Sequence, residues 1–246
     1  MAQTFTRYEK KYLLDQKQYE LLLDKLSAYI KPDKFYKSHI RSIYYDTDNY
    51  QLIRRSIEKP EYKEKLRIRS YEQANDDDKV FVEFKKKFDG IVYKRRTKAV
   101  CKEVIDDIYH CKFFDEQIAK EINYALSYYK DLHPAIYIGC TRTSYSVIDD
   151  DQLRITFDSD IRYRRKKLSL RSNEEDKEVT DKIVMEIKVG EAMPLWLVKI
   201  LDEVHAYPRG FSKVGTAFEK EMKEALTWKT YSQVYSMEHS QLVHSY

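Results

Sequence analysis

Three basic residues recur at every second position in one short segment of the chain. In Lys65-Leu66-Arg67-Ile68-Arg69 the cations alternate with aliphatic side chains. Side chains at i, i+2 and i+4 of a β-strand point to the same side, so the three cations share one face of any strand formed here. In a single strand this alternation usually means that one face meets water and the other meets the core. Its repetition in other segments favours a binding surface.

Cations hold equivalent positions in most of the other segments that have the pattern of strands. Arg binds phosphate oxygens through forked, bidentate bonds, and Lys acts on them as a compact point charge. Cations crowded into the lumen of a barrel repel one another unless carboxylates or a polyanion compensate them. We therefore predict a lumen that binds a chain of phosphates. The further cations that this pattern selects are Lys11, Lys85, Lys87, Arg142, Arg154 and Lys188.

Three glutamates share these faces with the cations. Glu9, Glu83 and Glu186 would be repelled by phosphate unless a hard divalent cation such as Mg²⁺ or Mn²⁺ lay between them. Cross-strand ion pairs with neighbouring Lys or Arg are the alternative interpretation for each glutamate. Glu186 is the metal ligand that we favour.

Eight segments have the alternation and the β-forming residues of strands, and they must position these side chains. The Asp89-Gly90 pair between two of them predicts a hairpin and antiparallel pairing. Asp15 predicts the start of a helix that ends before Pro32. The strands are expected at residues 4–14, 38–45, 63–71, 80–87, 91–100, 135–148, 152–163 and 182–189, and the helices at 16–30, 114–131, 194–206 and 216–228.

These elements predict an α+β fold, an eight-stranded antiparallel β-barrel with helices packed on the outside. The apolar stripes of the helices need an apolar sheet face, which leaves the charged face to line the lumen. The chain has no repeat of fixed period and no linker. We expect a single domain over residues 1–246, with a core at about 4–228 and a C-terminal tail at about 229–246.

Composition and charge exclude several classes of function. The formal net charge of +4 is small for a general nucleic-acid binder, so no nucleic acid is expected as a partner. The three cysteines lack the spacing of a zinc site. No apolar run is long enough to cross a bilayer, and the first twelve residues are too polar for a signal peptide. A cytoplasmic protein is expected.

Four short motifs, in this order along the chain, resemble those of one protein superfamily. They are RYEKKY at residues 7–12, SIYYDT at 42–47, KLRIR at 65–69 and FSK at 211–213. The first resembles the ExExK opening of the triphosphate tunnel metalloenzymes, the CYTH superfamily, with Arg7 in place of the usual first acid. The set resembles the vacuolar transporter chaperone (VTC) branch, whose catalytic domain is a polyphosphate polymerase.

The resemblance covers residues 4–228 and implies a stand-alone, prokaryote-like version of this domain. It implies that Glu186 binds Mn²⁺ or Mg²⁺ and that Lys94 and Arg95 lie at a tunnel mouth; Glu9 is carried over as a metal ligand from the wider superfamily, where the match is less specific. The implied catalytic residues are Lys65, Arg67, Arg69, Arg142, Arg154 and Lys213. The implied phosphate-binding residues are Lys11, Lys85, Lys87, Lys94, Arg95 and Lys188.

The resulting hypothesis is a divalent-metal-dependent transfer of the γ-phosphate of ATP to a growing polyphosphate chain inside the tunnel. One alternative is a triphosphatase of the same fold, in which Glu9 or Glu186 helps a metal to activate water. A second alternative is a non-catalytic module that binds polyphosphate or another polyanion. ATP and polyphosphate or triphosphate are the expected partners, and association with a separate membrane protein stays open, as does the oligomeric state.

Overall fold

The computed structural model describes residues 8–58, 60–89, 91–171, 175–190 and 192–225. Arg7, the first part of the first expected strand and the expected tail lie outside the described residues. The described part contains one antiparallel sheet with helices, which confirms the α+β class. Its strands are β1 (Tyr8–Leu14), β2 (Ile30–Asp46), β3 (Tyr62–Ser70), β4 (Lys79–Phe88), β5 (Ile91–Val100), β6 (His133–Val147), β7 (Asp150–Arg164), β8 (Lys177–Thr180) and β9 (Ile183–Val189).

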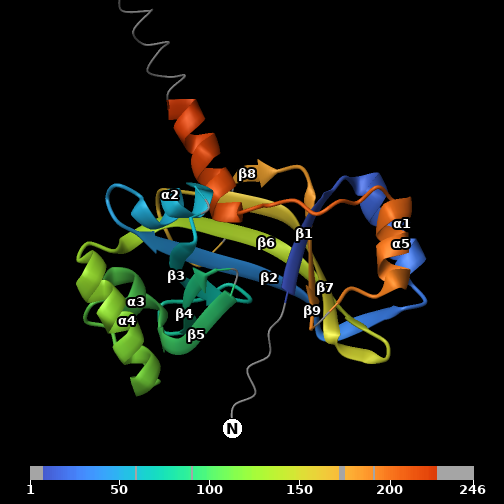
Figure 1. The fold of residues 1–246 in the computed structure, drawn as a ribbon. Coiled ribbons are helices and arrows are strands. Elements are labelled where there is room, and N and C mark those ends of the chain that lie inside the picture. The colour runs from blue at the N-terminus through green and yellow to red at the C-terminus, as the bar shows by residue number, and fades with distance from the viewer. Residues whose placement is uncertain (1–7, 59, 90, 172–174, 191, 226–246) are drawn as a thin grey trace, which may run out of the picture.

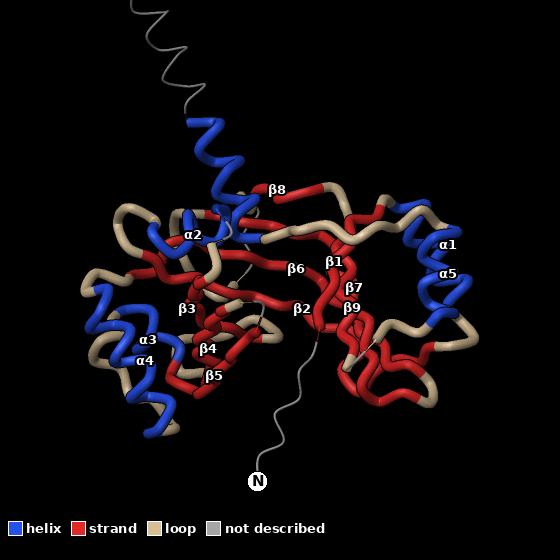
Figure 2. The backbone as a smooth tube through the Cα atoms, in the orientation of Figure 1, coloured by secondary structure: helices blue, strands red, loops and turns tan. Residues whose placement is uncertain are grey.

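The strands follow the order β1-β9-β7-β6-β2-β3-β4-β5, with β8 paired to β7. Strands β2 and β6, of 17 and 15 residues, run across the molecule and join two groups of strands (Figure 1, Figure 2). β1, β9 and β7 form one group, and β3, β4 and β5 form the other. The curved sheet thereby brings two sets of side chains to face each other across a hollow.

The expected closed barrel is wrong in one respect, because no ladder joins β1 to β5 among the described residues. Other segments occupy both edges of the sheet. Tyr12 of β1 forms a bridge with Pro208, and the Arg209 N–H donates to the Lys11 carbonyl at 2.7 Å. At the other edge, the Phe114 N–H donates to the carbonyl of Lys98 in β5 at 3.0 Å. These bonds satisfy edge groups that a closed barrel would pair strand to strand.

Two pairs of helices cover the convex face of the sheet. α1 (Gln16–Leu26) and α5 (Leu195–Glu203) pack on β1, β7 and β9, where Leu22 and Leu197 meet Phe157 and Met185. α3 (Cys101–Asp106) and α4 (Glu116–Tyr129) pack on β3, β4 and β5. These apolar contacts occupy one face of each strand, which leaves the opposite face for the charged side chains.

Two further helices lie on the concave side. α2 (Gln51–Glu58) and a helix at residues 213–225 pack against an apolar part of the concave face that includes Ile40, Ile138 and Val184. The carboxylate of Asp46, at the end of β2, accepts the Leu52 and Ile53 N–H groups at 2.8 and 2.7 Å. It thereby satisfies donors at the start of α2 that no helical bond can reach. These two helices therefore cover the apolar part of the concave face, and the rest of the hollow is lined by charged side chains.

The first helix is shorter than expected, and three short elements were not predicted. Asp15 caps α1, with a bond of 2.8 Å from the Gln18 N–H, as the sequence indicates. The helix ends at Leu26, however, and Pro32 lies inside β2, just before an irregularity in the β2–β6 register where a missing N–H is tolerated. The elements α2, α3 and β8 have eight residues or fewer, too few to show a period in the sequence. Among the described residues no helix is long and apolar enough to cross a membrane.

Candidate functional site

The charged faces of the strands point into the hollow. In β3, Leu66 and Ile68 are fully buried in the core under α3 and α4, so the alternate residues face the concave side. The register places Lys65 opposite Lys85 of β4, and Arg67 opposite Glu83. Helix packing thus decides which face of the strand the cations occupy, as the apolar stripes of the helices predict.

One wall of the hollow is built around Glu83, whose side chain is 1% exposed. Its Oε2 accepts Arg67 Nε at 2.9 Å and lies 3.8 Å from Arg69 Nε. Its Oε1 lies 2.7 Å from Lys94 Nζ and accepts Arg96 Nε at 2.8 Å. We call these five residues the Glu83 cluster. One carboxylate thus holds four cations from β3 and β5 in fixed positions.

The pKa values in the Glu83 cluster follow from this crowding. Burial by itself would raise the pKa of Glu83, but Arg67, Arg69 and Lys94 lower it far below its usual range. Burial lowers the pKa of Lys94 to about 8, against the raising effect of Glu83. Glu83 is therefore ionised at any pH at which the protein would work, and Lys94 is close to its titration point at slightly alkaline pH.

The facing wall carries a second cluster, made of Lys11, Arg142, Asp158, Glu186 and Lys213. Arg142 donates two bonds to Asp158, of 2.5 Å from Nε and 2.7 Å from Nη2. Lys213 Nζ lies 2.5 Å from Asp158 Oδ2 and 3.6 Å from Glu186 Oε1. The ammonium of Lys11 lies 3.5 Å from Glu186 Oε1. We call this set the Asp158–Glu186 cluster.

Glu9 extends this cluster toward the open side of the hollow. Its Oε1 lies 3.5 Å from Lys11 Nζ, and its Oε2 lies 4.0 Å from Lys188 Nζ. Burial and the nearby Glu186 raise the pKa of Glu9, but the surrounding lysines lower it overall. Burial likewise raises the pKa of Glu186, and Lys213, Lys11 and Arg142 lower it well below its usual range. Both carboxylates are ionised at neutral pH.

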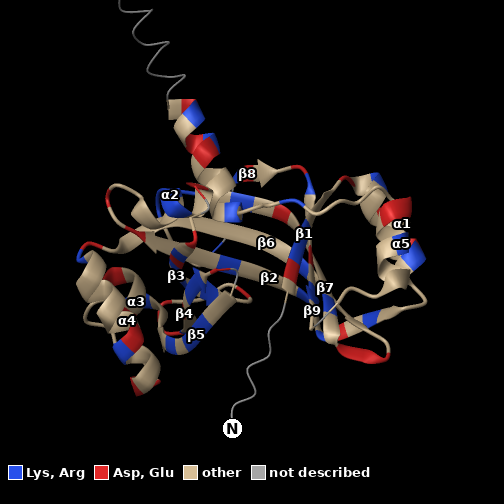
Figure 3. Cartoon of the chain, viewed as in Figure 1, with Lys and Arg blue, Asp and Glu red and all other residues tan. Residues whose placement is uncertain are grey.

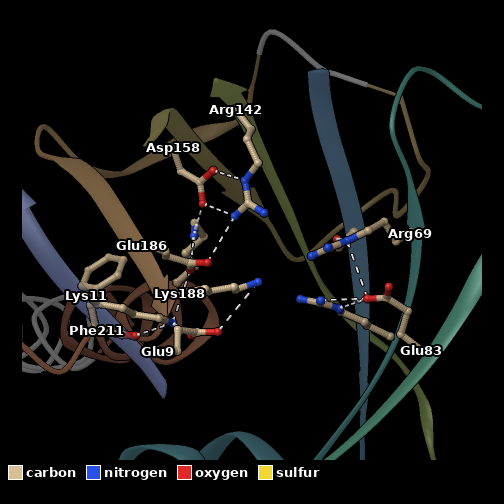
Figure 4. Close-up of polar contacts among 12 residues, drawn as sticks. Glu9, Lys11, Arg69, Glu83, Arg142, Asp158, Glu186, Lys188 and Phe211 are labelled. Atoms are coloured by element: carbon tan, nitrogen blue, oxygen red, sulfur yellow. Dashed lines mark hydrogen bonds and ion pairs between the residues drawn. The ribbon is translucent and has the colours of Figure 1, made fainter. Parts of the chain in front are cut away.

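The two clusters face each other across the hollow, as Figure 4 shows for Arg69 and Glu83 on one side and Arg142, Glu186 and Lys188 on the other. The hollow between them contains more cationic than anionic side chains. Burial and the Lys11 and Lys85 charges lower the pKa of Lys65 well below its usual value. Burial also lowers the pKa values of Lys85 and Arg69, assisted by Lys11 and by Arg67 respectively.

A loop at residues 207–212 spans the gap between β1 and β3. After its contacts with β1, its Phe211 carbonyl accepts Lys11 Nζ at 3.4 Å. Its Ser212 Oγ accepts Lys65 Nζ at 3.1 Å, and Lys213 follows directly. The loop therefore connects the two walls where strand pairing does not, and it delivers Lys213 to the Asp158–Glu186 cluster.

The comparison with family models gives a match to the VTC domain over residues 6–221. The chain belongs to the VTC domain family. A search of curated proteins finds no match. The matched span includes every charged residue of both clusters, so the hollow just described belongs to the VTC domain itself.

Solved structures also resemble this VTC domain. A Bacillus halodurans protein provisionally described as an adenylate cyclase aligns with a TM-score of 0.51 at 14% identity, over 83% of this chain and 92% of the other. The PH1819 protein of Pyrococcus horikoshii OT3 aligns with a TM-score of 0.45 at 15% identity, over 87% and 99%. The first likeness supports the antiparallel tunnel-like fold; at these identities it carries no information on the reaction.

Most of the residues expected in the site lie on the concave face; Arg95 does not, and Arg154 lies at the edge of that face. Arg95 lies on the opposite face of β5, where its Nε donates to Glu121 of α4 at 2.9 Å. Arg154 does lie on the concave face of β7, opposite Lys188 of β9, but near the exposed end of the strand, where it pairs with Asp33. Each of these two arginines therefore pairs with a carboxylate outside the two clusters. Lys87 lies opposite Lys63 at the rim of the hollow.

Two important residues of the site were missed by the sequence analysis. Arg96 takes the place that was assigned to Arg95, because neighbours in a strand point to opposite faces and Lys94 already points inward. The same alternation could have found it. Asp158 follows Arg154 and Thr156 at two-residue spacing, and this period was a signal for a third inward side chain in β7.

The carboxylates suit a divalent metal only in combination with other ligands. Within the described ranges, no group of three or more His, Cys, Asp or Glu residues is arranged to hold a metal ion. Glu9 and Glu186 nevertheless both approach the Lys11 ammonium and both are ionised. Mg²⁺ characteristically uses one or two carboxylates together with water and substrate phosphates. The donor set fits a metal that enters with a phosphate ligand.

Proposed function

We propose that this VTC domain is a polyphosphate polymerase that transfers the γ-phosphate of ATP to the end of a polyphosphate chain. The observation that carries the proposal is the unbalanced charge of Lys65 and Lys85. No carboxylate of the described residues forms an ion pair with either ammonium within 4.0 Å; burial and neighbouring cations lower the pKa of Lys65, and they lower that of Lys85 against the raising effect of Glu9 and Glu186. A chain of phosphates between the walls would supply the missing negative charge.

The reaction needs no nucleophile from the protein. An oxygen of the terminal phosphate of the chain attacks the γ-phosphorus of ATP, the bond from this phosphorus to the β–γ bridging oxygen breaks, and ADP leaves with the bond electrons. Phosphoryl transfer of this kind depends on positioning and on stabilisation of charge. Polyphosphate longer by one phosphate and ADP are the products.

The protein side chains hold the reacting groups in fixed positions. Asp158 fixes the guanidinium of Arg142 through two bonds, and Glu83 fixes that of Arg67. Cations that are already oriented need no rearrangement when charge develops on the phosphoryl group. Arg142, Lys213 and Lys11 on one wall, with Arg67 and Arg69 on the other, would bind the oxygens on both sides of the transferring phosphate.

Glu186, with Glu9 beside it, would hold Mg²⁺ or Mn²⁺ shared with the phosphates. When bound, the metal supplies further neutralisation of negative charge on the phosphate oxygens. The carboxylates need no proton release before they bind it, because both are ionised at neutral pH. Asp158, with Arg142 and Lys213 within 2.7 Å of its oxygens, serves to position these cations.

The test is to incubate the purified protein with ATP and Mn²⁺ or Mg²⁺, with and without a short phosphate primer. Gel electrophoresis and ³¹P NMR resolve the products. The Glu186→Ala variant should lose activity, and the matched control Glu203→Ala, whose carboxylate pairs with Lys25 on the surface, should keep it. Growing chains with ADP release would support the polymerase.

Two other results would overturn the proposal in different ways. Orthophosphate without chain growth would assign the site to a metal-dependent triphosphatase. Binding of triphosphate without turnover, in either metal and with primer present, would assign it to a polyanion-binding module. Equal activity of the Glu186→Ala variant and the wild type would remove Glu186 from the site.

A further inference from the structure

One corner of the molecule exposes a group of large apolar side chains. They lie at the tip of the β4–β5 hairpin, at the start of β3 and on α4, and each is between 39% and 71% exposed. We call this group the hairpin patch, made of Tyr62, Phe88, Ile91, Tyr93 and Tyr124. A clustered exposed apolar surface of this kind indicates an interaction site.

The members of the hairpin patch lie next to one another. The rings of Tyr62 and Phe88 are 6.4 Å apart, and Phe88 pairs with Ile91 across the hairpin. A groove of about 300 Å³ between the hairpin and α4 is lined by Tyr62, Phe88 and Tyr93, together with Lys86, Arg95 and Glu121. The aromatic rings are thus continuous with a groove that has a cation at its edge.

The hairpin that carries the patch is strongly basic. Residues 84–98 contain seven Lys or Arg and a single acid, Asp89. Lys86 and Arg95 lie on the same face as the patch, keep 31% and 47% of their side chains exposed, and pair with Glu64 and Glu121. Figure 3 shows the basic residues along β4 and β5. The apolar tip therefore belongs to a hairpin with an excess of positive charge, part of which lies on the face of the patch.

We propose that the hairpin patch binds the surface of an anionic lipid bilayer. Tyr and Phe side chains suit the boundary between headgroups and acyl chains, and Lys and Arg beside them bind anionic headgroups. A second copy of the chain is a poorer occupant, because a twofold contact would bring the basic hairpins of both copies together. This inference concerns the outside of the domain and does not depend on the reaction in the hollow.

The first experiment measures sedimentation of the full chain with vesicles. The protein should bind vesicles of phosphatidylcholine mixed with phosphatidylglycerol, bind phosphatidylcholine alone weakly, and dissociate as salt is raised. The double variant Phe88→Ser, Ile91→Ser should bind at least about tenfold more weakly. The matched control is Phe35→Ser, which removes an exposed Phe beside Lys34 on β2 and should bind as the wild type does.

A second measurement locates the contact and does not depend on removing the patch. The Phe88→Trp variant should show a blue-shifted additional emission with anionic vesicles, quenched by brominated lipid, relative to wild-type fluorescence. Phe35→Trp should show neither effect. The proposal is overturned by failure of the wild type to bind anionic vesicles, by equal binding of the folded double variant, or by additional emission from Phe88→Trp that brominated lipid leaves unquenched. Concentration-dependent dimerisation that the double variant abolishes would assign the patch to a second copy instead.

Discussion

Replacing Glu83 with glutamine should destabilise the fold while leaving its shape in place. The substitution removes one charge and keeps the volume, so Arg67, Arg69, Lys94 and Arg96 would be left crowded around a neutral amide. Removing one partner from a buried ion pair typically costs about 3–5 kcal/mol. The side chain of Glu83 is 1% exposed, so solvent cannot compensate for the loss. We expect a loss in this range, equivalent to a fall in melting temperature on the order of 10 °C.

The assay is thermal and urea unfolding followed by circular dichroism, with Glu121→Gln as the matched control. Glu121 also pairs with an arginine of β5, at 2.9 Å, but on the surface, where such pairs contribute about 0–1 kcal/mol. The control should therefore unfold close to the wild type. Added triphosphate should stabilise the Glu83→Gln variant at least as much as the wild type, because the variant has one more uncompensated cation in the hollow.

The pH dependence provides an independent check of the same reasoning. Glu83 has a lowered pKa in the folded protein, so its contribution to stability is full above the unfolded pKa of about 4.3 and is lost as pH falls below it. Wild-type stability should therefore decrease on acidification below about pH 5, and the variant should lose less. Equal melting temperatures of Glu83→Gln and the wild type at pH 7 would refute the view that this carboxylate holds the wall together.

Three further predictions concern other parts of the molecule. If the hollow transfers phosphoryl groups, Arg142→Met should lower turnover about a hundredfold in steady-state kinetics, with a smaller change in KM; unchanged turnover would remove Arg142 from the reaction. Triphosphate should raise the lowered pKa of Lys65, so binding takes up protons and weakens as pH rises through the pKa of the free protein; calorimetry in buffers of different ionisation enthalpy measures this uptake, and Lys65→Met should reduce it. Asp46→Asn should cost about 1–3 kcal/mol in urea unfolding, because an amide cannot accept all the N–H groups that the carboxylate accepts at the start of α2; wild-type stability would contradict that role.

The alternation of residues along strands carried most of the sequence-based prediction. In β3 the two-residue period selects Lys65, Arg67 and Arg69 as one face, and the structure places all three on the concave side. The same rule, followed strictly, would have selected Arg96 in place of Arg95. The resemblance implied both Lys94 and Arg95, but neighbours in a strand point in opposite directions, so only one of the two can face the hollow.

Several features depended on contacts that the sequence does not show. The Tyr29–Ile30 region was expected to continue the first helix, but Ile30 pairs with Val147 at the far end of β6. That Glu83 pairs with four cations follows only from the combined register of β3, β4 and β5. A carboxylate in one strand gives no indication of which arginines reach it from two others.

Local spacing along the chain was enough to predict the antiparallel sheet, the basic character of its strands and the apolar stripes of the helices, because these features involve residues that are near neighbours in the sequence. How the sheet ends and what closes it depended on long-range contacts. Pro208 and Ser212 join the edge of β1 to β3, and α2 and the last helix cover the apolar part of the hollow. These contacts join residues far apart in the chain, and only the folded curvature of the sheet sets the distance between them.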